Sequence, residues 1–356
     1  MPGPLLLLDS ASLYYRAFHG VPTTVTAPDG SPVNAVRGFL DMLTGLLTAR
    51  RPAAGVACWD DDWRPAFRVR ALPTYKSHRV IDPLTGAEAT PELLGPQVPV
   101  IAEVLAAIGI ARVGAPGFEA DDVIATLATT PTLTAAPSPT LAPAPADPAS
   151  GATPPASATE ASVGGTMPSP TATSRVMPEV FRPEGVEIVT GDRDLFQLVD
   201  DEAGIRVLYT GRGMRRLETI DAAALTARYG VATGQAYTEL SILRGDPSDG
   251  LPGVPGIGER SAAALLSRFG NLDGVLASLS ELPPAQRARL EAARDYLAAA
   301  RRVVPVVRDV PLSPVDAALP SAPPDPEALD ALRGRWGLAS PLKRLLEAIA
   351  ATRTER

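Results

Sequence analysis

The sequence predicts an α/β domain built on a parallel sheet and followed by a smaller helical region. From residue 5 to about residue 230, short apolar runs alternate with amphipathic stretches, which is typical of a parallel sheet with crossover helices. After about residue 230 the strand-like runs stop, and patterns rich in Ala, Leu and Arg continue to the end. The 356 residues are enough for about two domains of ~150 residues.

The expected strands are five short apolar runs, at 5–8, 55–59, 110–113, 186–190 and 205–209. Helical patterns lie between them, for example at 35–48 and 97–108. One stretch, 131–180, interrupts this alternation, because it consists mainly of Ala, Pro, Thr, Ser and Gly. Such a composition cannot build a hydrophobic core, so we expect a disordered insertion that serves as a passive spacer.

Composition excludes several classes of protein. A single cysteine, Cys58, rules out a disulfide framework and a Cys-rich zinc site, so any bound metal ion would be held by oxygen atoms. No apolar run reaches the ~18 residues that a membrane span needs, and the run at 5–8 lacks the basic flank of a signal peptide. We therefore expect a cytoplasmic protein with no membrane partner.

Acidic residues gather where strands end and where helices begin. Asp9, Asp60 and Asp192 each follow an expected strand, and the carboxyl ends of parallel strands meet at the ligand-binding edge of an open α/β sheet. Each one alone could be an ordinary turn or helix-cap residue. Further carboxylates lie at helix starts or just after a helix, namely Glu119, Asp121, Asp122, Asp194, Asp246 and Asp249.

Nine converging carboxylates repel one another unless hard cations neutralise them. Oxygen ligands favour Mg²⁺ or Mn²⁺, and a group of this size indicates two or more ions. Two such ions are the usual apparatus for attack of water on a phosphodiester, whereas glycoside hydrolysis by a carboxylate pair fits poorly with so many acids and so few aromatic residues. The formal charge of −7 becomes +2 when the nine carboxylates are set aside, so the acidity of the whole chain does not exclude a nucleic-acid partner.

A basic stretch with interleaved aromatic residues follows the strand that leads to Asp60. Basic residues suit phosphates and aromatic residues suit unstacked bases, although a solvated helix face would show the same pattern. Lysine is rare in the chain, since only Lys76 and Lys343 occur beside 31 arginines. The members of the stretch are Trp63, Arg64, Phe67, Arg68, Arg70, Tyr75, Lys76, His78 and Arg79.

The segment LPGVPGIGERSAAALL at 251–266 predicts a Gly/Pro hairpin that leads into a helix. Its backbone N–H groups and the helix dipole would hold a phosphate without reading the base sequence. A plain interhelical turn is the alternative, but such a turn needs one glycine and not three. The candidate DNA-binding residues of this hairpin are Gly253, Val254, Gly256, Ile257, Gly258 and Arg260.

Six motifs in this order resemble the 5′→3′ exonuclease and flap endonuclease family, such as the N-terminal domain of bacterial DNA polymerase I. They are LLLLDSASLYYRAFHG, the strand before Asp60, YKSHR, EADDVIATLA, VTGDRDLFQLV and GDPSDGLPGVPGIGE. The resemblance runs from about residue 4 to 310, apart from the insertion. It implies a PIN-like nuclease domain at 1–230 with a helical arch at about 61–95, and a helix-three-turn-helix at 231–310. A C-terminal helical tail at 311–356 is expected to follow.

The resemblance also implies roles for individual residues. The nine carboxylates match the family's metal ligands, Lys76 and Arg79 match the arch residues that steady the scissile phosphate, and Tyr75 matches a base-stacking tyrosine. Arg16 matches an active-site arginine near the first aspartate. The hairpin is expected to bind duplex DNA and a K⁺ ion.

The implied enzyme cuts nicked, 5′-overhanging or flapped duplexes and leaves 5′-phosphorylated products. We expect it to act as a free-standing monomer in DNA replication and repair, near the nucleoid and alongside a separate DNA polymerase. A PIN-type ribonuclease and a non-catalytic DNA-binding scaffold are the alternatives. The motifs leave open whether exonuclease or flap endonuclease activity dominates.

Three departures from the family pattern stand out. Asp60, Asp61 and Asp62 are consecutive, so the motif does not say which of them is the ligand. Gly250 stands where many relatives have Asn, and Arg260 replaces the usual Lys of the hairpin helix.

Overall fold

A six-stranded sheet forms the centre of the structure, a computed structural model that describes residues 3–82, 84–130, 133–134 and 183–354. The strand order is β5-β2-β1-β7-β8-β9, and neighbouring strands are parallel except for the β8–β9 pair. All five expected strands are confirmed, and the sequence pattern missed only β9 among the strands of this sheet. The strands are β1 (Leu5–Asp9), β2 (Ala54–Cys58), β5 (Ala111–Val113), β7 (Val186–Thr190), β8 (Ile205–Tyr209) and β9 (Glu218–Ile220).

Strand β1 lies in the middle of the sheet and is buried on both faces. Leu5 and Leu7 point into one hydrophobic core, whereas Leu6 and Leu8 point into the other. This double burial explains why β1 is a continuous apolar run and does not alternate with polar residues.

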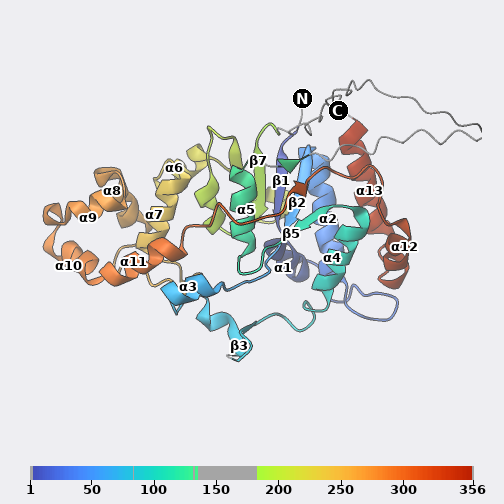
Figure 1. Ribbon diagram of the computed structural model, residues 1–356, viewed down its shortest axis with the longest axis horizontal. Helices are drawn as coiled ribbons and strands as arrows, with labels where there is room; N and C mark the ends of the chain where they lie inside the picture. Colours follow the sequence, from blue (N-terminus) through green and yellow to red (C-terminus); the bar gives the residue numbers. More distant parts are fainter. Residues whose placement is uncertain (1–2, 83, 131–132, 135–182, 355–356) are drawn as a thin grey trace, which may run out of the picture.

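Five helices cover one face of the sheet, and they include the C-terminal segment. The expected tail at 311–356 is not an appendage, because α13 packs along α2 and buries Leu342 and Leu345 in the same core as Leu6 (Figure 1). A parallel pair of two-residue strands, β6 (Leu133–Thr134) and β10 (Val315–Asp316), also joins this segment to the domain. The five helices are α1 (Ser10–Gly20), α2 (Asn34–Arg50), α4 (Gln97–Ile108), α12 (Pro326–Arg335) and α13 (Ala339–Thr354).

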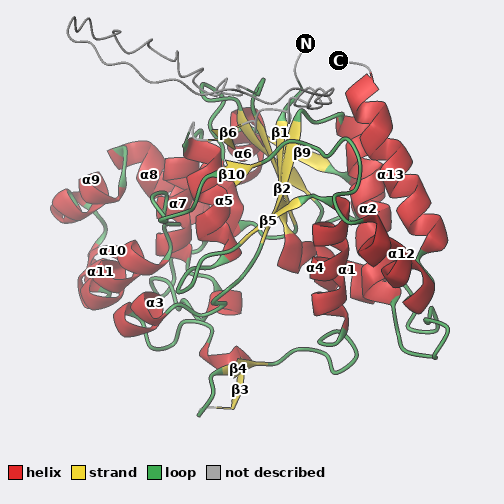
Figure 2. Ribbon diagram, turned by 45° about the vertical axis from the view of Figure 1, so that its right-hand side comes forward, coloured by secondary structure: helices red, strands yellow, loops and turns green. Residues whose placement is uncertain are grey.

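The opposite face is covered by α5 (Ala120–Thr129), and the helical region extends from that side (Figure 2). One hydrophobic core continues from Leu5 and Leu7 of the sheet to Leu290 and Leu297 of the helical region. The helical region is therefore joined to the sheet by shared packing. Its helices are α6 (Ala222–Tyr229), α7 (Gly234–Arg244), α8 (Glu259–Phe269), α9 (Leu272–Ala277), α10 (Pro284–Ala292) and α11 (Arg294–Val303).

The expected arch at 61–95 is helical only in part. It contains the short helix α3 (Ala66–Ala71), a 3-10 turn at Ser77–Arg79, and an antiparallel hairpin of β3 (Val80–Asp82) and β4 (Ala87–Glu88). The hairpin extends away from the body of the molecule (Figure 2). The β-branched residues Val80 and Ile81 and the turn around Gly86 favour this hairpin over a continuous helix.

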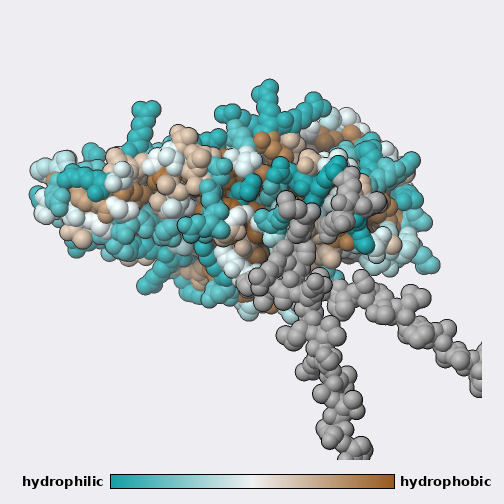
Figure 3. Space-filling model, turned by 90° about the horizontal axis from the view of Figure 1, so that it is seen from above, coloured by the Kyte–Doolittle hydropathy of each residue, from teal (hydrophilic) through white to brown (hydrophobic). Residues whose placement is uncertain are grey.

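The expected insertion at 131–180 lies outside the described residues except for Leu133 and Thr134 in β6. Within the described ranges, no helix has both the length and the apolar character of a membrane span. Hydrophilic side chains project from much of the face seen from above, over both the helical region and the sheet region (Figure 3).

Candidate active site

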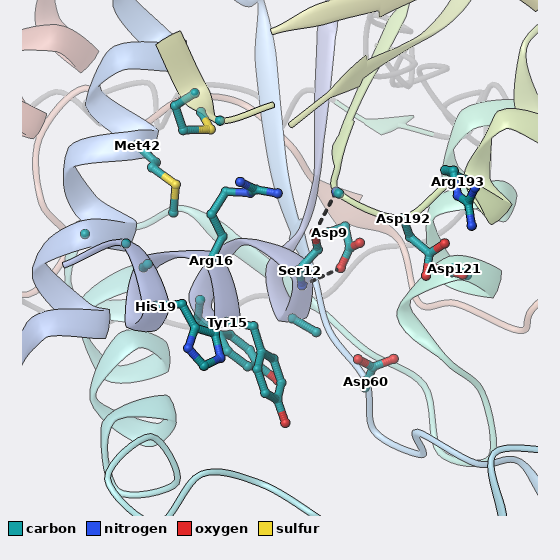
Figure 4. A pocket seen from close by; sticks show the side chains of 18 of the residues that line it. Asp9, Ser12, Tyr15, Arg16, His19, Met42, Asp60, Asp121, Asp192 and Arg193 are labelled. Carbon is teal, nitrogen blue, oxygen red and sulfur yellow. Dashed lines mark hydrogen bonds between the residues drawn. The ribbon is translucent and has the colours of Figure 1, made fainter. Parts of the chain in front are cut away.

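A cavity of about 1560 Å³ opens at the carboxyl ends of the central strands. Asp9, Asp60, Asp121 and Asp192 gather at one side of it, and they come from β1, the segment after β2, α5 and the segment after β7 (Figure 4). The predicted convergence of acids from separate strands is therefore present. The candidate ligands that line the cavity are Asp9, Asp60, Glu119, Asp121, Asp192 and Asp246.

Asp9 is held firmly because it ends β1 and caps α1. Its carboxylate accepts hydrogen bonds from the Ser12 N–H at 3.1 Å and from Thr190 Oγ1 at 2.6 Å. Burial raises the pKa of Asp9 to about 7, and the neighbouring Asp60 charge adds to this rise.

Asp60 is the member of the Asp60–Asp62 triplet that reaches the neighbouring helix. Its carboxylate accepts a hydrogen bond from the Ala120 N–H at the start of α5, at 2.7 Å, and burial raises its pKa to about 6. Asp62 instead accepts from the Arg64 N–H at 3.1 Å, and Asp61 is exposed. Asp60 is therefore the member of the triplet that is fixed to α5, although Asp61 also lines the cavity, and the role of Asp60 as the ligand stays a prediction.

Three further acids of the cluster, Asp121, Asp194 and Asp249, have a raised pKa. Removal from water raises the pKa of Asp121 and of Asp194 well above the usual value, and the charge of Asp192 raises both further. The pKa of Asp249 is raised for the same two reasons. Carboxylate oxygens that gather at one edge of the sheet match the chemistry of Mg²⁺ or Mn²⁺. Within the described chain, however, no three His, Cys, Asp or Glu side chains are already arranged to hold an ion.

Asp122 and Arg68 need a correction, because the structure places them in the interior. Asp122 is fully buried, and its two carboxylate oxygens accept from the Arg68 guanidinium at 2.6 and 2.7 Å. Arg68 is 2% exposed. Asp122 is therefore occupied by protein donors and not open to a metal ion, and Arg68 cannot contact DNA.

Glu119 joins the arch to the cavity. Its carboxylate accepts hydrogen bonds from the Tyr75 hydroxyl at 2.9 and 3.0 Å and forms ion pairs with Lys76 and Arg68. Removal from water lowers the pKa of Lys76, but the Glu119 charge, the hydrogen bond to Glu119 and the neighbouring Tyr75 and Asp249 together outweigh it, so the pKa is raised overall. Tyr75 is 4% exposed, so its predicted stacking on a base is not possible in this conformation.

The other predicted cations lie around the cavity in different ways. Arg79 Nη2 donates to Asp249 at 3.0 Å and to the Ser248 carbonyl at 2.8 Å. Arg16 lies at the cavity wall, where its Nε donates to Thr210 Oγ1 at 3.0 Å (Figure 4). Arg64 donates to backbone carbonyls of the arch, whereas Arg70 is exposed.

The hairpin between α7 and α8 has the predicted form. Gly253 has a φ of +69°, and a Cβ there would lie 2.2 Å from the Arg244 carbonyl oxygen, so this position requires glycine. Val254 and Ile257 bury their side chains, so only their backbone could face a ligand.

The start of α8 is open. Gly258 is its N-cap and supplies no side-chain hydrogen bond, and Gly258 and Arg260 are exposed. The first N–H groups of α8 therefore suit an anion.

Two arginines near the cluster were not singled out from the sequence. Arg193, which lines the cavity, lies 3.9 Å from Asp246 (Figure 4 shows its position). Arg244 lies 3.9 Å from Asp246 and 3.2 Å from Glu259, so it connects the acidic cluster to the start of α8. The motif GDRD, in which Arg193 stands between two candidate ligands, was a usable signal for the first of them.

Two family models match the chain. The model "5'-3' exonuclease, N-terminal resolvase-like domain" covers residues 4–137, and "5'-3' exonuclease, C-terminal SAM fold" covers residues 232–327. The second match begins where the expected helical region begins.

Similar proteins and structures agree with these matches. A 5′-3′ exonuclease of Streptomyces coelicolor is 48% identical over 97% of this chain and 100% of its own, and one of Mycobacterium tuberculosis is 42% identical over 98% of both. DNA polymerase I of Mycobacterium tuberculosis is 34% identical over 87% of this chain and 28% of the polymerase.

Among solved structures, the T5 D15 protein crystallised with metal ions has a TM-score of 0.56 and 16% identity, over 97% of this chain and 99% of its own, so it is similar in fold. The identities over the full length of the exonucleases exceed what a shared fold alone requires. The chain belongs to the 5′-3′ exonuclease family and is a nuclease.

Proposed function

We propose that this chain is a divalent-metal-dependent 5′ nuclease that hydrolyses phosphodiester bonds in duplex DNA with a 5′ flap, an overhang or a nick. The observation that carries the proposal is the juxtaposition of six candidate carboxylate ligands with Lys76, Arg79 and Arg16 around one cavity. A second support is that metal ions and DNA appear together in the description of the T5 D15 flap endonuclease complex, whose fold is similar.

The donor set indicates which residues would hold the ions. Asp9, Asp60, Glu119, Asp121, Asp192 and Asp246 around the cavity, together with Asp194 and Asp249, would hold two or more Mg²⁺ or Mn²⁺ ions. When bound, these ions would activate the attacking water and stabilise the leaving oxygen. The carboxylates contribute by being fixed before the ion arrives, as the two hydrogen bonds to Asp9 illustrate.

Lys76 and Arg79 would steady the scissile phosphate. In this structure they pair with Glu119 and Asp249, which are themselves candidate metal ligands. If ions neutralise these acids, both cations become free to turn toward a phosphate, and Arg16 offers a third positive charge at the cavity wall. The products of this cleavage would carry the phosphate at their 5′ ends.

The hairpin and the start of α8 would hold the duplex by its backbone. The N–H groups after Gly258 suit a phosphate, and backbone carbonyls of the hairpin would bind a K⁺ ion, as the family resemblance implies. Unpairing of the terminal nucleotides costs least at an end or junction, which gives selectivity for structure over sequence. We place this activity in DNA replication and repair, in a cytoplasmic, nucleoid-associated monomer that works beside a separate DNA polymerase.

Cleavage of defined substrates tests the proposal. A labelled duplex with a 5′ flap, a nicked duplex and single-stranded RNA are each incubated with Mg²⁺, with Mn²⁺ or with EDTA. Metal-dependent cutting of the flap and nick with 5′-phosphorylated products is expected. Cutting of the RNA alone would indicate a PIN-type ribonuclease, and binding without cutting would indicate a DNA-binding scaffold.

A further inference from the structure

Arg68 belongs to the basic stretch of the arch, yet its side chain lies inside the protein with 2% exposure. It comes from α3, which lies beside α11 although the two helices are far apart in the sequence (Figures 1 and 2). The guanidinium enters the space between the start of α5 and the end of α11. A DNA contact is excluded by this burial, so the charge must serve another purpose.

The guanidinium of Arg68 has an acceptor at each nitrogen. Nη2 and Nη1 donate to the two oxygens of Asp122 at 2.6 and 2.7 Å, and Nη1 also donates to Glu119. Nε donates to the Val303 carbonyl at the end of α11, at 3.1 Å. The planar guanidinium of Arg68 thus donates hydrogen bonds to four oxygens at the ends of two helices. The single ammonium group of a lysine could not make all four of these contacts.

Asp122 is fixed independently of Arg68. One of its oxygens accepts from the Val307 N–H at 2.8 Å, and the other accepts from the Glu119 N–H at 3.2 Å. Asp122 therefore holds the Arg68 guanidinium in place, and Nη1 of Arg68 also donates to the Glu119 carboxylate.

Glu119 connects Arg68 to the cavity. The same carboxylate that pairs with Arg68 on its inner side pairs with the Lys76 ammonium, and Glu119 and Lys76 line the cavity, which Arg68 does not. A continuous chain of charged contacts thus runs from the end of α11 through Arg68 and Glu119 to Lys76.

We propose that Arg68 is a positioning residue, which fixes Glu119 and through it the Lys76 ammonium relative to the helical region that carries the DNA-binding hairpin. The effect on cleavage rests on the proposed function, because it assumes that Lys76 acts on the scissile phosphate. The placement of Lys76 itself can be measured without DNA, which keeps the two proposals separable.

The test uses a variant in which both buried charges are removed. Arg68→Gln alone leaves Asp122 buried without its partner and threatens folding. The double variant Arg68→Gln/Asp122→Asn removes the charge of both groups, so it is expected to fold and to unfold thermally close to the wild type. The matched control is Arg50→Gln/Glu187→Gln, which removes both charges of the ion pair between Arg50 and buried Glu187, outside the cavity.

The first measurement is amine labelling followed by mass spectrometry. The chain has only two lysines, and their side chains are 15% exposed at Lys76 and 75% exposed at Lys343, which serves as the internal reference. Loss of the contact between Arg68 and Glu119 in the double variant leaves the Tyr75 hydroxyl and Lys76 as the side-chain partners of Glu119. Labelling of Lys76 is therefore expected to become about tenfold faster, as for loss of about one charge-assisted contact. An unchanged labelling rate of Lys76 in the folded double variant overturns the proposal. The control Arg50→Gln/Glu187→Gln should leave the rate unchanged.

The second measurement is single-turnover cleavage of a 5′-flap duplex with Mg²⁺, with DNA affinity measured in Ca²⁺. The double variant is expected to cleave about tenfold more slowly at unchanged affinity, and to have no further effect when Lys76→Ala is already present. The single variant Arg68→Lys should not reach the wild-type cleavage rate, because lysine lacks the planar guanidinium group. Wild-type cleavage by the stable double variant would make Arg68 purely structural and overturn the proposal. Absence of cleavage by the wild type would contradict the proposed function alone, because the labelling result would still stand.

Discussion

Asp121 and Asp122 are neighbours in the chain but serve two different regions, the cavity and the interior behind it. Asp121 lines the cavity, and removal from water together with the Asp192 charge raises its pKa well above the usual value. Asp122 is fully buried and holds both Nη atoms of Arg68. The interior acid is paired with its cation, whereas the cavity acid forms no ion pair with any residue that the structure describes. Excess negative charge therefore marks the candidate metal site, and compensated charge marks the support behind it.

The strongest test of this comparison removes the charge on the cavity side. Asp121→Asn is expected to slow flap cleavage at least ~10³-fold, because the ion would lose a ligand that contributes several kcal/mol to the transition state. Thermal stability without metal should be equal or higher, since one source of repulsion is removed. Single-turnover cleavage and thermal unfolding measure the two effects, and full activity would exclude Asp121 as a ligand.

The matched substitution on the interior side, Asp122→Asn, should have the opposite effect on the stability of the protein. Asp122→Asn leaves Arg68 buried with only Glu119 as a charged partner, and loss of one member of a buried pair costs about 3–5 kcal/mol. Urea unfolding should show this loss. If Asp122→Asn retained wild-type stability but lost metal binding, Asp122 would be a ligand after all and the comparison would fail.

Lys76 lies at the border between the two regions. Lys76→Ala is expected to slow the chemical step by about 10²-fold with little change in DNA affinity, as for loss of one positioned electrostatic group. Lys343→Ala, an exposed lysine on α13, is the control for the loss of one positive charge. Equal rates for the two variants would show that Lys76 does not act on the phosphate.

The extent to which Mg²⁺ stabilises the protein should depend on pH through the acids of the cavity alone. Burial raises the pKa of Asp9 to about 7 and that of Asp60 to about 6, above the ordinary aspartate value of 3.8, so protons bind these groups more tightly in the folded state. Their contribution to the stability of the metal-free protein is complete below about pH 4 and is lost as the pH rises through 6 to 7. Mg²⁺ replaces those protons, so it should raise the unfolding temperature more at pH 8 than at pH 5. Asp9→Asn should reduce this difference, and an equal Mg²⁺ effect at both pH values would contradict the assignment.

Several features could be predicted from the sequence because they depend on local pattern. The run LLLLD predicts a strand that is buried on both faces and delivers Asp9 to its end, and the structure confirms both. The glycines of the hairpin were also informative, because Gly253 occupies a position where a Cβ would collide with the backbone.

Features that depend on contacts between distant segments could not be predicted. The segment at 311–356 looked like a tail, because the amphipathic pattern of α13 does not name its partner, and only folding brings it onto α2. The arch was expected to be helical by resemblance, yet part of it pairs as β3 and β4.

The sequence by itself determined the parallel α/β sheet, the helical region and the set of acids at the ends of the strands, since each of these follows from local periodicity and spacing. Only the tertiary structure decided what each charge does. Arg68 and Arg70 are two residues apart on the same short helix, and Asp121 and Asp122 are adjacent, yet one member of each pair is buried. The physical reason is that burial and pairing depend on which groups α5 and α11 bring to the same place, and a charge without a partner there would be too costly to bury.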